Sequence, residues 1–290
     1  MPCGPWQEQV TPLGPAVSIA ASGQSCQSRT SGSASPVFLC GLCTSSLDMA
    51  NLFLERDMLP EWGSVLVSSQ TAGRGQLGRS WHSAAGNLFA AVRLPMAAPF
   101  DGMAAAPALG AYLVTVLRHL GYKVWFKWPN DVVGREDGQP RKLCGILLEE
   151  RHGALVAGIG VNAVTPPPGD ALREGHALDG GCLPALGNGP RPGLLPLWLQ
   201  LVDGIKFCYE QIPPVSGRDF SGEPRTSGDN WRQLAEPWLL YKDCPVALVD
   251  GAHDAVRLRG RVAGLAPDGG LRLLNAGGMH TVHSGSLIPE

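Results

Sequence analysis

The sequence has no marked excess of charge of either sign. It carries 23 lysine and arginine residues against 25 aspartate and glutamate residues over 290 positions, a formal net charge of −2. Because nucleic-acid-binding surfaces are usually strongly basic, this balance gives no reason to expect a nucleic-acid partner. With 44% hydrophobic and 17% charged residues, the composition is that of an ordinary soluble globular protein.

Long apolar runs are also missing. No stretch reaches the length of a membrane-spanning helix, and the N-terminus carries no secretory signal pattern. Eight cysteines are present, but only Cys40 and Cys43 form a C-x-x-C motif, with no second pair near them. A buried strand with two small thiols explains this motif more simply than zinc. We therefore expect no protein-built metal site, reduced cysteines, a cytoplasmic location and no membrane partner.

Glycine and proline divide the chain into ordered and irregular stretches. Residues 1–35 are rich in Gly, Pro, Ser and Gln and have few large apolar residues, which favours a tail. Residues 36–213 are expected to form a large domain, 214–230 a linker, and 231–290 a small β-barrel with short strands parted by Asp-Gly and Gly-Gly turns. A chain of this length can bury a core in both domains.

Within the large domain, strands outnumber helices. The patterns predict strands at 37–43, 61–69, 86–94, 124–126, 142–149 and 154–162, and helices at 47–56, 102–121 and 194–211. Residues 134–140 resemble a hairpin loop, and residues 165–193, with six prolines and seven glycines, predict a long loop that acts as a lid. Because hairpins join the strands, an α+β fold with a mixed β-sheet covered by helices fits better than a doubly wound sheet.

The segment Ser69–Trp81 contains three glycines, two arginines and no acid. Glycines at 73, 75 and 78 allow backbone N–H groups to approach a ligand, while Arg74 and Arg79 offer planar guanidinium groups that match phosphate geometry. The segment therefore suggests a phosphate clamp, with a solvated turn as the alternative. Its spacing fits neither the Walker pattern nor the dinucleotide fingerprint, because residues 81–95 resemble a strand rather than a helix.

Two further segments carry polar residues at the ends of expected strands. Lys127, Asn130 and Asp131 follow an extended Val-Trp-Phe stretch, a position where functional side chains are common. Lys142 opens a strand whose next residues are almost wholly apolar. A lysine there is either a functional cation or a gatekeeper that protects the strand from aggregation.

Four motifs occur in a fixed order along the chain: Gln70–Gly75, Lys127–Asp131, Arg141–Glu149 and Gly158–Asn162. Together they closely resemble the biotin–protein ligases. The resemblance runs from about residue 36 to the C-terminus, since residues 260–274 also look like the C-terminal module of that family. It implies a biotin/lipoate ligase-like catalytic domain followed by a small SH3-like β-barrel.

The resemblance also implies a reaction. Enzymes of this family join biotin to ATP, with Mg²⁺, to give biotinyl-5′-AMP and pyrophosphate, and then transfer biotin to a lysine of a biotin carboxyl carrier protein. The expected partner is the carrier domain of a biotin-dependent carboxylase; a homodimer is compatible with the sequence, which fixes no oligomeric state. Residues 1–35 are too few for a winged-helix module, so the form without an N-terminal DNA-binding domain is expected.

Site residues are carried over from the matching motifs. The implied catalytic residues are Lys142, Arg74 and Asp131, the last to orient or deprotonate the attacking carrier lysine. The implied biotin-binding residues are Ser45, Ser46, Gln70, Gly73, Arg74, Trp81, Lys142 and Gly145. The implied ATP- and adenylate-binding residues are Arg74, Gly75, Gln76, Arg79, Trp81, Asn130, Lys142 and Asn162. Helix capping by either serine and an Asx-turn at Asp131 are the structural alternatives.

Two positions depart from the family pattern. Gln76 stands where an arginine is usual, and Thr44 stands where an acid is usual before the Ser-Thr pair. Gln76 supplies a hydrogen bond but no charge, which suggests weaker retention of the adenylate. Two other functions remain as alternatives. One is a lipoate or octanoate transferase of the same fold, and the other, suggested by Gln76, is a biotin- or adenylate-binding sensor without turnover.

Overall fold

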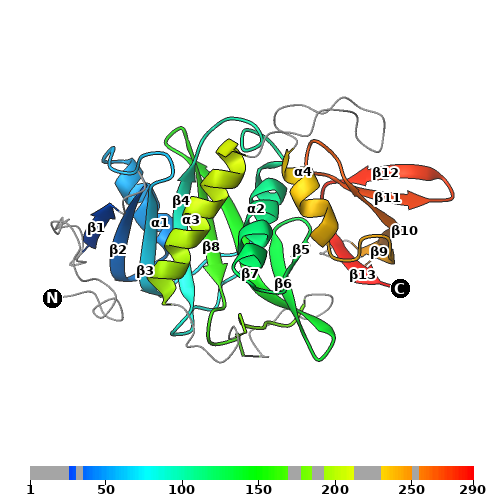
Figure 1. Ribbon diagram of the computed structural model, residues 1–290, viewed down its shortest axis with the longest axis horizontal. Helices are drawn as coiled ribbons and strands as arrows, with labels where there is room; N and C mark the ends of the chain where they lie inside the picture. Colours follow the sequence, from blue (N-terminus) through cyan, green and yellow to red (C-terminus); the bar gives the residue numbers. More distant parts are fainter. Residues whose placement is uncertain (1–25, 31–34, 169–177, 185–192, 212–229, 250–254) are drawn as a thin grey trace. The chain divides into compact units, whose positions relative to one another are not determined.

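The chain folds into two compact units. A computed structural model describes residues 26–30, 35–168, 178–184, 193–211, 230–249 and 255–290 (Figure 1). Unit 1 comprises residues 1–96, 143–167 and 181–203, and unit 2 comprises residues 97–142, 168–180 and 204–290. The predicted linker, most of the predicted tail and much of the predicted lid lie outside the described residues.

The main sheet is mixed and has eight strands. Its strand order is β1-β2-β3-β4-β8-β7-β6-β5. The strands are β1 (Cys26–Thr30), β2 (Pro36–Cys43), β3 (Ser64–Gln70), β4 (Leu88–Leu94), β5 (Trp125–Lys127), β6 (Asp131–Glu136), β7 (Gln139–Arg151) and β8 (Ala154–Val161). β2 and β3 run parallel, whereas β3–β4, β4–β8 and β7–β8 are antiparallel. The prediction of a mixed sheet is confirmed.

In unit 1, helices cover the sheet on both faces (Figure 1). Helix α1 (Ser46–Leu54) packs on one face, where its Phe53 joins a core that includes Val65 and Val67 of β3. Side chains alternate along a strand, so Ser64 points to the other face. There its hydroxyl accepts a hydrogen bond of 2.9 Å from the indole of Trp198, in α3 (Leu194–Gln211).

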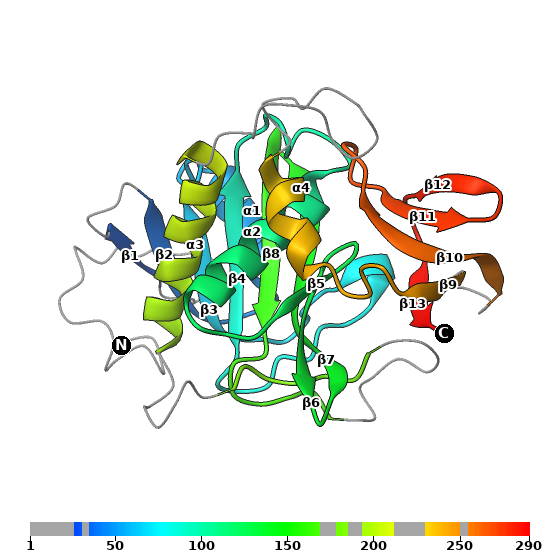
Figure 2. The same cartoon turned by 45° about the vertical axis from the view of Figure 1, so that its right-hand side comes forward.

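Unit 2 contains α2 (Ala105–His119), which packs against β5, β6 and α4 (Asn230–Ala235). The side chain of Phe126 fills the space beside Gly110, where an added Cβ would lie 2.4 Å from the ring. Helix α4 lies alongside α2 (Figure 2) and continues into the short 3-10 helix η4 (Glu236–Trp238).

The C-terminal part of unit 2 is a second, five-stranded sheet in the order β12-β11-β10-β9-β13. Its strands are β9 (Pro245–Val249), β10 (Val256–Leu265), β11 (Leu271–Asn275), β12 (Gly278–Val282) and β13 (Ser286–Pro289). Strand β10 is longer than the short strands expected here and keeps its pairing across two register shifts. The described strand order is open at β12 and β13, so closure into an SH3-like barrel is not confirmed.

Three local predictions are corrected by the structure. The strand after the glycine segment begins at Leu88 rather than at residue 81. The loop predicted at 134–140 is only a two-residue turn, Asp137 and Gly138, whose φ angles of 49° and 79° suit a tight hairpin. Strand β6 therefore continues to Glu136, and β7 begins at Gln139. Part of the predicted tail is ordered, because β1 pairs antiparallel with β2. None of the described helices is long and apolar enough to span a membrane.

Candidate functional site

The residues implied by the four motifs fall into two groups, one in each unit. Unit 1 holds Ser45, Ser46, Gln70, Gly73, Arg74, Gly75, Gln76, Arg79, Trp81, Gly145 and Asn162, and unit 2 holds Asn130, Asp131 and Lys142. Each group has its own geometry and electrostatics.

The glycine segment forms a short hairpin. The amide of Gly75 donates to the carbonyl of Arg79, and the amide of Trp81 donates to the carbonyl of Gly73, both at 2.8 Å. A Cβ at Gly73 would lie 2.8 Å from the Trp81 carbonyl oxygen and 2.9 Å from the Gln70 amide nitrogen. Only glycine fits this position, because one of the two neighbours is backbone and cannot move aside.

The two serines after β2 have separate tasks. The hydroxyl of Ser45 accepts a hydrogen bond of 3.1 Å from the amide of Asp48 and caps α1, a role that the sequence left open for either serine. The hydroxyl of Ser46 is buried and donates to the Ala90 carbonyl at 3.1 Å. A polar floor therefore lies where the resemblance places biotin.

Gln70 ties this floor to the hairpin. Its Oε1 accepts from the amide of Ser46 at 2.8 Å, and its Nε2 donates to the hydroxyl of Ser83 at 3.0 Å. Ser83 in turn donates to the Trp81 carbonyl at 3.4 Å. Ser83 was missed by the motif comparison because it follows the hairpin outside the matched segments.

The indole of Trp81 packs on the sheet at a glycine position. A Cβ at Gly160 of β8 would lie 2.5 Å from the indole of Trp81, so the ring rests on the glycine backbone. Gly145 of β7 is the direct partner of Gly160 in the ladder. These two glycines give an indole, or a flat ligand ring, close access to the strands.

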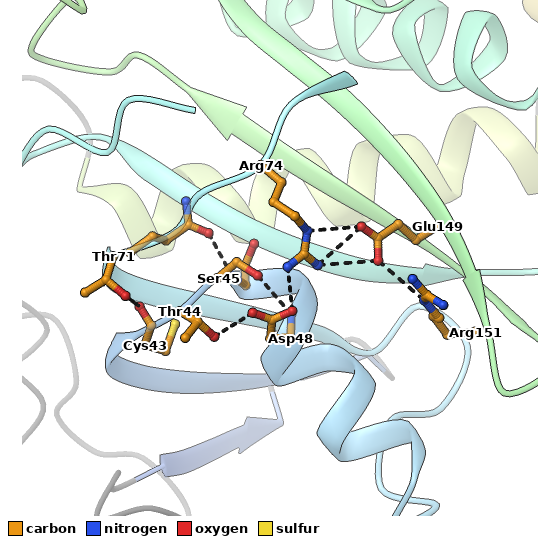
Figure 3. Close-up of polar contacts among 10 residues, drawn as sticks. Cys43, Thr44, Ser45, Asp48, Thr71, Arg74, Glu149 and Arg151 are labelled. Carbon is orange, nitrogen blue, oxygen red and sulfur yellow. Dashed lines mark hydrogen bonds and ion pairs between the residues drawn. The ribbon is translucent and has the colours of Figure 1, made fainter. Parts of the chain in front are cut away.

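Arg74 is engaged by two carboxylates (Figure 3). Its Nη1 lies 2.6 Å from Asp48 Oδ1, and its Nη2 lies 3.2 Å from Glu149 Oε1. Asp48 and Glu149 were not predicted, since they lie outside the glycine segment, on α1 and β7. One guanidinium faces two carboxylates, so an anion that binds Arg74 competes with them for its N–H donors.

Asp48 is held by more than the arginine. Its Oδ2 accepts a hydrogen bond from the hydroxyl of Thr44. Its backbone amide donates to the hydroxyl of Ser45. Although burial by itself raises the pKa of the Asp48 carboxyl, the hydrogen bonds from Thr44 and Arg74 lower it below its usual value. This carboxylate therefore stays charged at neutral pH.

The second group, in unit 2, is a carboxylate between two lysines. Lys142 Nζ lies 2.7 Å from Asp131 Oδ1, and Lys127 Nζ lies 3.6 Å from Asp131 Oδ2. The Asp131 side chain is 14% exposed, and that of Lys142 is 31% exposed. Lys127 completes the cluster; it stands in the matched Lys-Trp-Pro-Asn-Asp motif but was not assigned a role.

The two ammonium groups control the charge of Asp131. Burial raises the pKa of this carboxyl, but attraction to Lys142 and Lys127 outweighs burial and lowers the pKa below its usual value. A carboxylate with a lowered pKa is a weak general base. The lowered pKa therefore makes Asp131 a weaker proton acceptor than an ordinary carboxylate.

A described part of the predicted lid lies beside Lys142. The amide of Lys142 donates to the carbonyl of Asp179 at 2.8 Å, and Lys142 forms an isolated bridge with Gly180. The neighbouring Arg141 makes an ion pair with the Asp179 carboxylate. Backbone pairing thus fixes the main chain of Lys142 and leaves its side chain partly accessible.

The remaining implied residues differ in exposure. Arg79 is exposed on the hairpin, and Gln76 is half-buried at the start of η2 (Gln76–Gly78). Asn130 and Asn162 are buried, and the amide of Asn162 donates to the Leu143 carbonyl at 2.8 Å. Within the described parts of the chain, no group of three or more His, Cys, Asp or Glu side chains is arranged to hold a metal ion.

This geometry can be compared with known proteins. Residues 41–164 match the biotin/lipoate A/B protein ligase family. This part of the chain is similar to a domain of that family. The matched residues contain the polar floor, the hairpin and the Lys127–Asp131–Lys142 cluster, so both groups of site residues lie within the match.

Curated relatives match over part of their length. The chain is 32% identical over 129 residues to the bifunctional ligase/repressor BirA of Bacillus subtilis, covering 42% of this chain and 38% of that protein. It is 39% identical over 108 residues to BirA of Escherichia coli, covering 34% of this chain and 32% of that protein. The chain thus matches about a third to two fifths of these relatives.

Solved structures support the fold over most of the chain. The biotin protein ligase from Aquifex aeolicus, in complex with biotin and ATP, superposes with a TM-score of 0.65 at 22% identity, covering 88% of this chain and 98% of that one. The biotin protein ligase of Leishmania major with biotin gives a TM-score of 0.51 at 20% identity, covering 85% and 96%. At these identities the likeness concerns the fold alone.

Proposed function

We propose that this chain is an ATP-dependent ligase that forms biotinyl-5′-AMP and transfers biotin to a lysine of a biotin carboxyl carrier protein. The observation that carries the proposal is the cluster of Lys127, Asp131 and Lys142. In a domain of this family, two ammonium groups oriented by one buried carboxylate are suited to an anionic reaction centre.

The proposed reaction has two steps. In the first, a carboxylate oxygen of biotin attacks the α-phosphorus of ATP, the bond to the β-phosphate breaks, and pyrophosphate leaves. In the second, the amine of the carrier lysine attacks the acyl carbon, the acyl–phosphate bond breaks with its electrons going to AMP, and the amine loses a proton to water. Negative charge develops next to the α-phosphate in both steps, so fixed cations there lower both barriers.

We assign Lys142 to this charge because Asp131 fixes the position of its ammonium group. We assign Arg74, in unit 1, to anion binding, where the anion would compete with Asp48 and Glu149. Asp131 serves to orient Lys142, since its lowered pKa makes it a poor acceptor of the amine proton.

Biotin is assigned to the polar floor of Ser45, Ser46 and Gln70, with Trp81 above Gly160. Hydroxyl and amide groups supply the donors and acceptors that a ureido ring needs. Gln70 is already bonded at both ends of its amide, so we propose that it shapes the floor and that its contacts rearrange when the ring binds.

Magnesium would neutralise the leaving pyrophosphate. In the described parts of the chain, the carboxylates that contact Arg74 and Lys142 are those of Asp48, Glu149 and Asp131, and all three are already ion-paired. Phosphate oxygens and water would therefore supply most ligands of the ion. The donor set here fits a metal that enters with ATP.

The test is incubation of the full chain with a biotin carboxyl carrier domain, biotin and MgATP, followed by mass spectrometry of the carrier. The expected product is the carrier with one biotinyl group on one lysine. Parallel incubations with a lipoyl domain plus lipoate or octanoate test the transferase alternative. Tight binding of biotinyl-5′-AMP without biotin-dependent exchange between pyrophosphate and ATP would instead establish a sensor.

A further inference from the structure

Two residues that flank Lys127 are hydrogen-bonded to the C-terminal part of unit 2. The amide of Leu240 donates to the carbonyl of Phe126 at 2.8 Å, and the indole Nε1 of Trp128 donates to the carbonyl of Gly269 at 2.9 Å. Phe126 and Trp128 are 0% and 2% exposed. The segment that precedes Asp131 is therefore anchored on both sides of its lysine.

Lys127 lies between these anchors and faces the other way. Side chains alternate along an extended segment, so the buried positions 126 and 128 place Lys127 on the opposite side, where its ammonium group reaches Asp131. A shift of either anchor would move Lys127 and, four residues on, the carboxylate that orients Lys142.

The turn that carries Gly269 has little freedom. The φ angle of Gly269 is +88°, and a Cβ added to Gly269 would lie 2.7 Å from the Cα of Ala104, in the segment that leads into α2. Asp268 also fixes Gly270, the residue after Gly269, because its Oδ1 accepts a hydrogen bond of 3.0 Å from the Gly270 amide. The other oxygen of Asp268 lies 2.9 Å from Nε2 of His283. The acceptor for Trp128 is thus fixed from several sides.

We infer that Trp128 and Gly269 are positioning residues through which the β10–β11 turn sets the geometry of the Lys127–Asp131–Lys142 cluster. This inference rests on the proposed function for its catalytic consequence, but its structural part is independent of any ligand. The C-terminal sheet then acts on the rate of the chemical step, not only on the stability of the fold.

A matched control is available in the same chain. Trp198 is also fully buried, and its Nε1 also donates one hydrogen bond of 2.9 Å, to Ser64. Trp128→Phe and Trp198→Phe each remove one indole donor from a buried ring. Only the first change touches the segment that carries Lys127 and Asp131.

The experiment compares these variants in biotin-dependent pyrophosphate–ATP exchange and in amide hydrogen exchange without ligand. We expect Trp128→Phe to lower kcat roughly 10- to 100-fold, since a displacement of about 1 Å costs rates of this order, with KM for biotin unchanged. Exchange at the amides of residues 127, 128, 130 and 131 is expected to quicken in Trp128→Phe but not in Trp198→Phe. Trp198→Phe should retain the kcat of the unmodified protein.

A second pair of variants addresses the acceptor. Gly269→Ala is expected to act like Trp128→Phe, because its Cβ collides with backbone. Gly278→Ala, which also has a positive φ but no atom within 4 Å of the added Cβ, should not. Equal loss of kcat in Trp128→Phe and Trp198→Phe, or unchanged exchange at 127–131, would overturn the inference. If exchange at 127–131 is faster in Trp128→Phe but the unmodified chain does not biotinylate a carrier, the positioning role of Trp128 is supported and the proposed function is contradicted.

Discussion

At the scale of single residues, the cations of the candidate site differ in how strongly they are already neutralised. Arg74 faces two carboxylates, whereas Lys142 shares one carboxylate with Lys127. In these described contacts, cations outnumber the carboxylate around Asp131 but do not outnumber the carboxylates around Arg74. The two cations should respond differently to substitution.

Lys142→Ala is expected to fold and to lose adenylate formation by a factor of ~10²–10³ or more, the usual effect of removing a preorganised charge at a developing anion. The measurement is single-turnover formation of biotinyl-5′-AMP. Lys123→Ala removes an exposed lysine of the same unit and serves as the control. Near-normal single-turnover rates in Lys142→Ala would remove this lysine from the mechanism.

Arg74 should become more available when its counter-ions are neutralised. Asp48→Asn and Glu149→Gln each remove one competing carboxylate, so we expect roughly 2- to 5-fold tighter binding of ATP in calorimetry, in keeping with a partly exposed ion pair worth up to about 1 kcal/mol. Glu150→Gln, at an exposed position next in the strand, is the control. Weaker ATP binding in both variants would mean that the acids preorganise Arg74 instead of competing for it.

At the scale of elements, the hairpin of residues 73–81 depends on one glycine more than on the others. Its two backbone hydrogen bonds join Gly73 to Trp81 and Gly75 to Arg79. An added Cβ is blocked at Gly73 but meets only ordinary contacts of 3.6–3.8 Å at Gly75. Steric room, rather than the count of glycines, thus decides which position is essential.

Gly73→Ala is expected to weaken biotin binding at least about 10-fold, because the Cβ must displace the Trp81 carbonyl or the Gln70 amide that lines the proposed biotin floor. Gly75→Ala should bind biotin nearly as the unmodified chain does. Calorimetric titration with biotin separates the two. Equal affinities would show that the Gly73 contact is not part of the biotin site.

The same hairpin is expected to become ordered when ligand binds. Its composition gives little intrinsic rigidity, and Arg74 must change partners to reach a phosphate. Amides 73–80 should exchange more slowly with biotinyl-5′-AMP than without it. Identical exchange in the two states would count against a closing role for this segment.

At the scale of the whole molecule, acid stability follows from its paired carboxylates. The pKa values of Asp48, Asp131 and Asp268 are all held below the ordinary value of an aspartate. A carboxyl with a lowered folded pKa contributes its full stabilisation well above the unfolded pKa of about 4, and this contribution is lost as the pH falls below that value and through the lower folded pKa. Stability should therefore begin to drop below about pH 5 and continue to fall as the pH passes the folded pKa values.

Asp131→Asn is expected to lower the free energy of unfolding at pH 7 by roughly 1–3 kcal/mol, because it leaves two lysines without their carboxylate. It should also flatten the pH dependence below pH 5. Asp48→Asn should have a smaller effect, since its side chain is 38% exposed and screened by solvent. Urea unfolding at pH 7, 5 and 3 gives these values; an unchanged acid limb in Asp131→Asn would contradict the assignment.

The sequence by itself determined the strands, helices and motif residues of this protein. Alternation and helical periodicity depend on neighbouring residues, so the strands at β2, β3 and β8 and the helices α1, α2 and α3 were found with small errors at their ends. The sequence offered Ser45 or Ser46 as the cap of the first helix, and the structure assigns the cap to Ser45. The two-residue turn at Asp137 and Gly138 was missed because strand ends and loops share the same polar residues.

Only the tertiary structure decided which charges face each other. Asp48 and Glu149 lie 26 and 75 residues from Arg74, and Gly269 lies 141 residues from Trp128. No periodicity links positions so far apart in the sequence, because their contact depends on strand order and on how helices and turns pack. The sequence specified a cationic glycine segment and a lysine-bearing strand; the fold determined that Arg74 is neutralised and that Lys142 is oriented by Asp131.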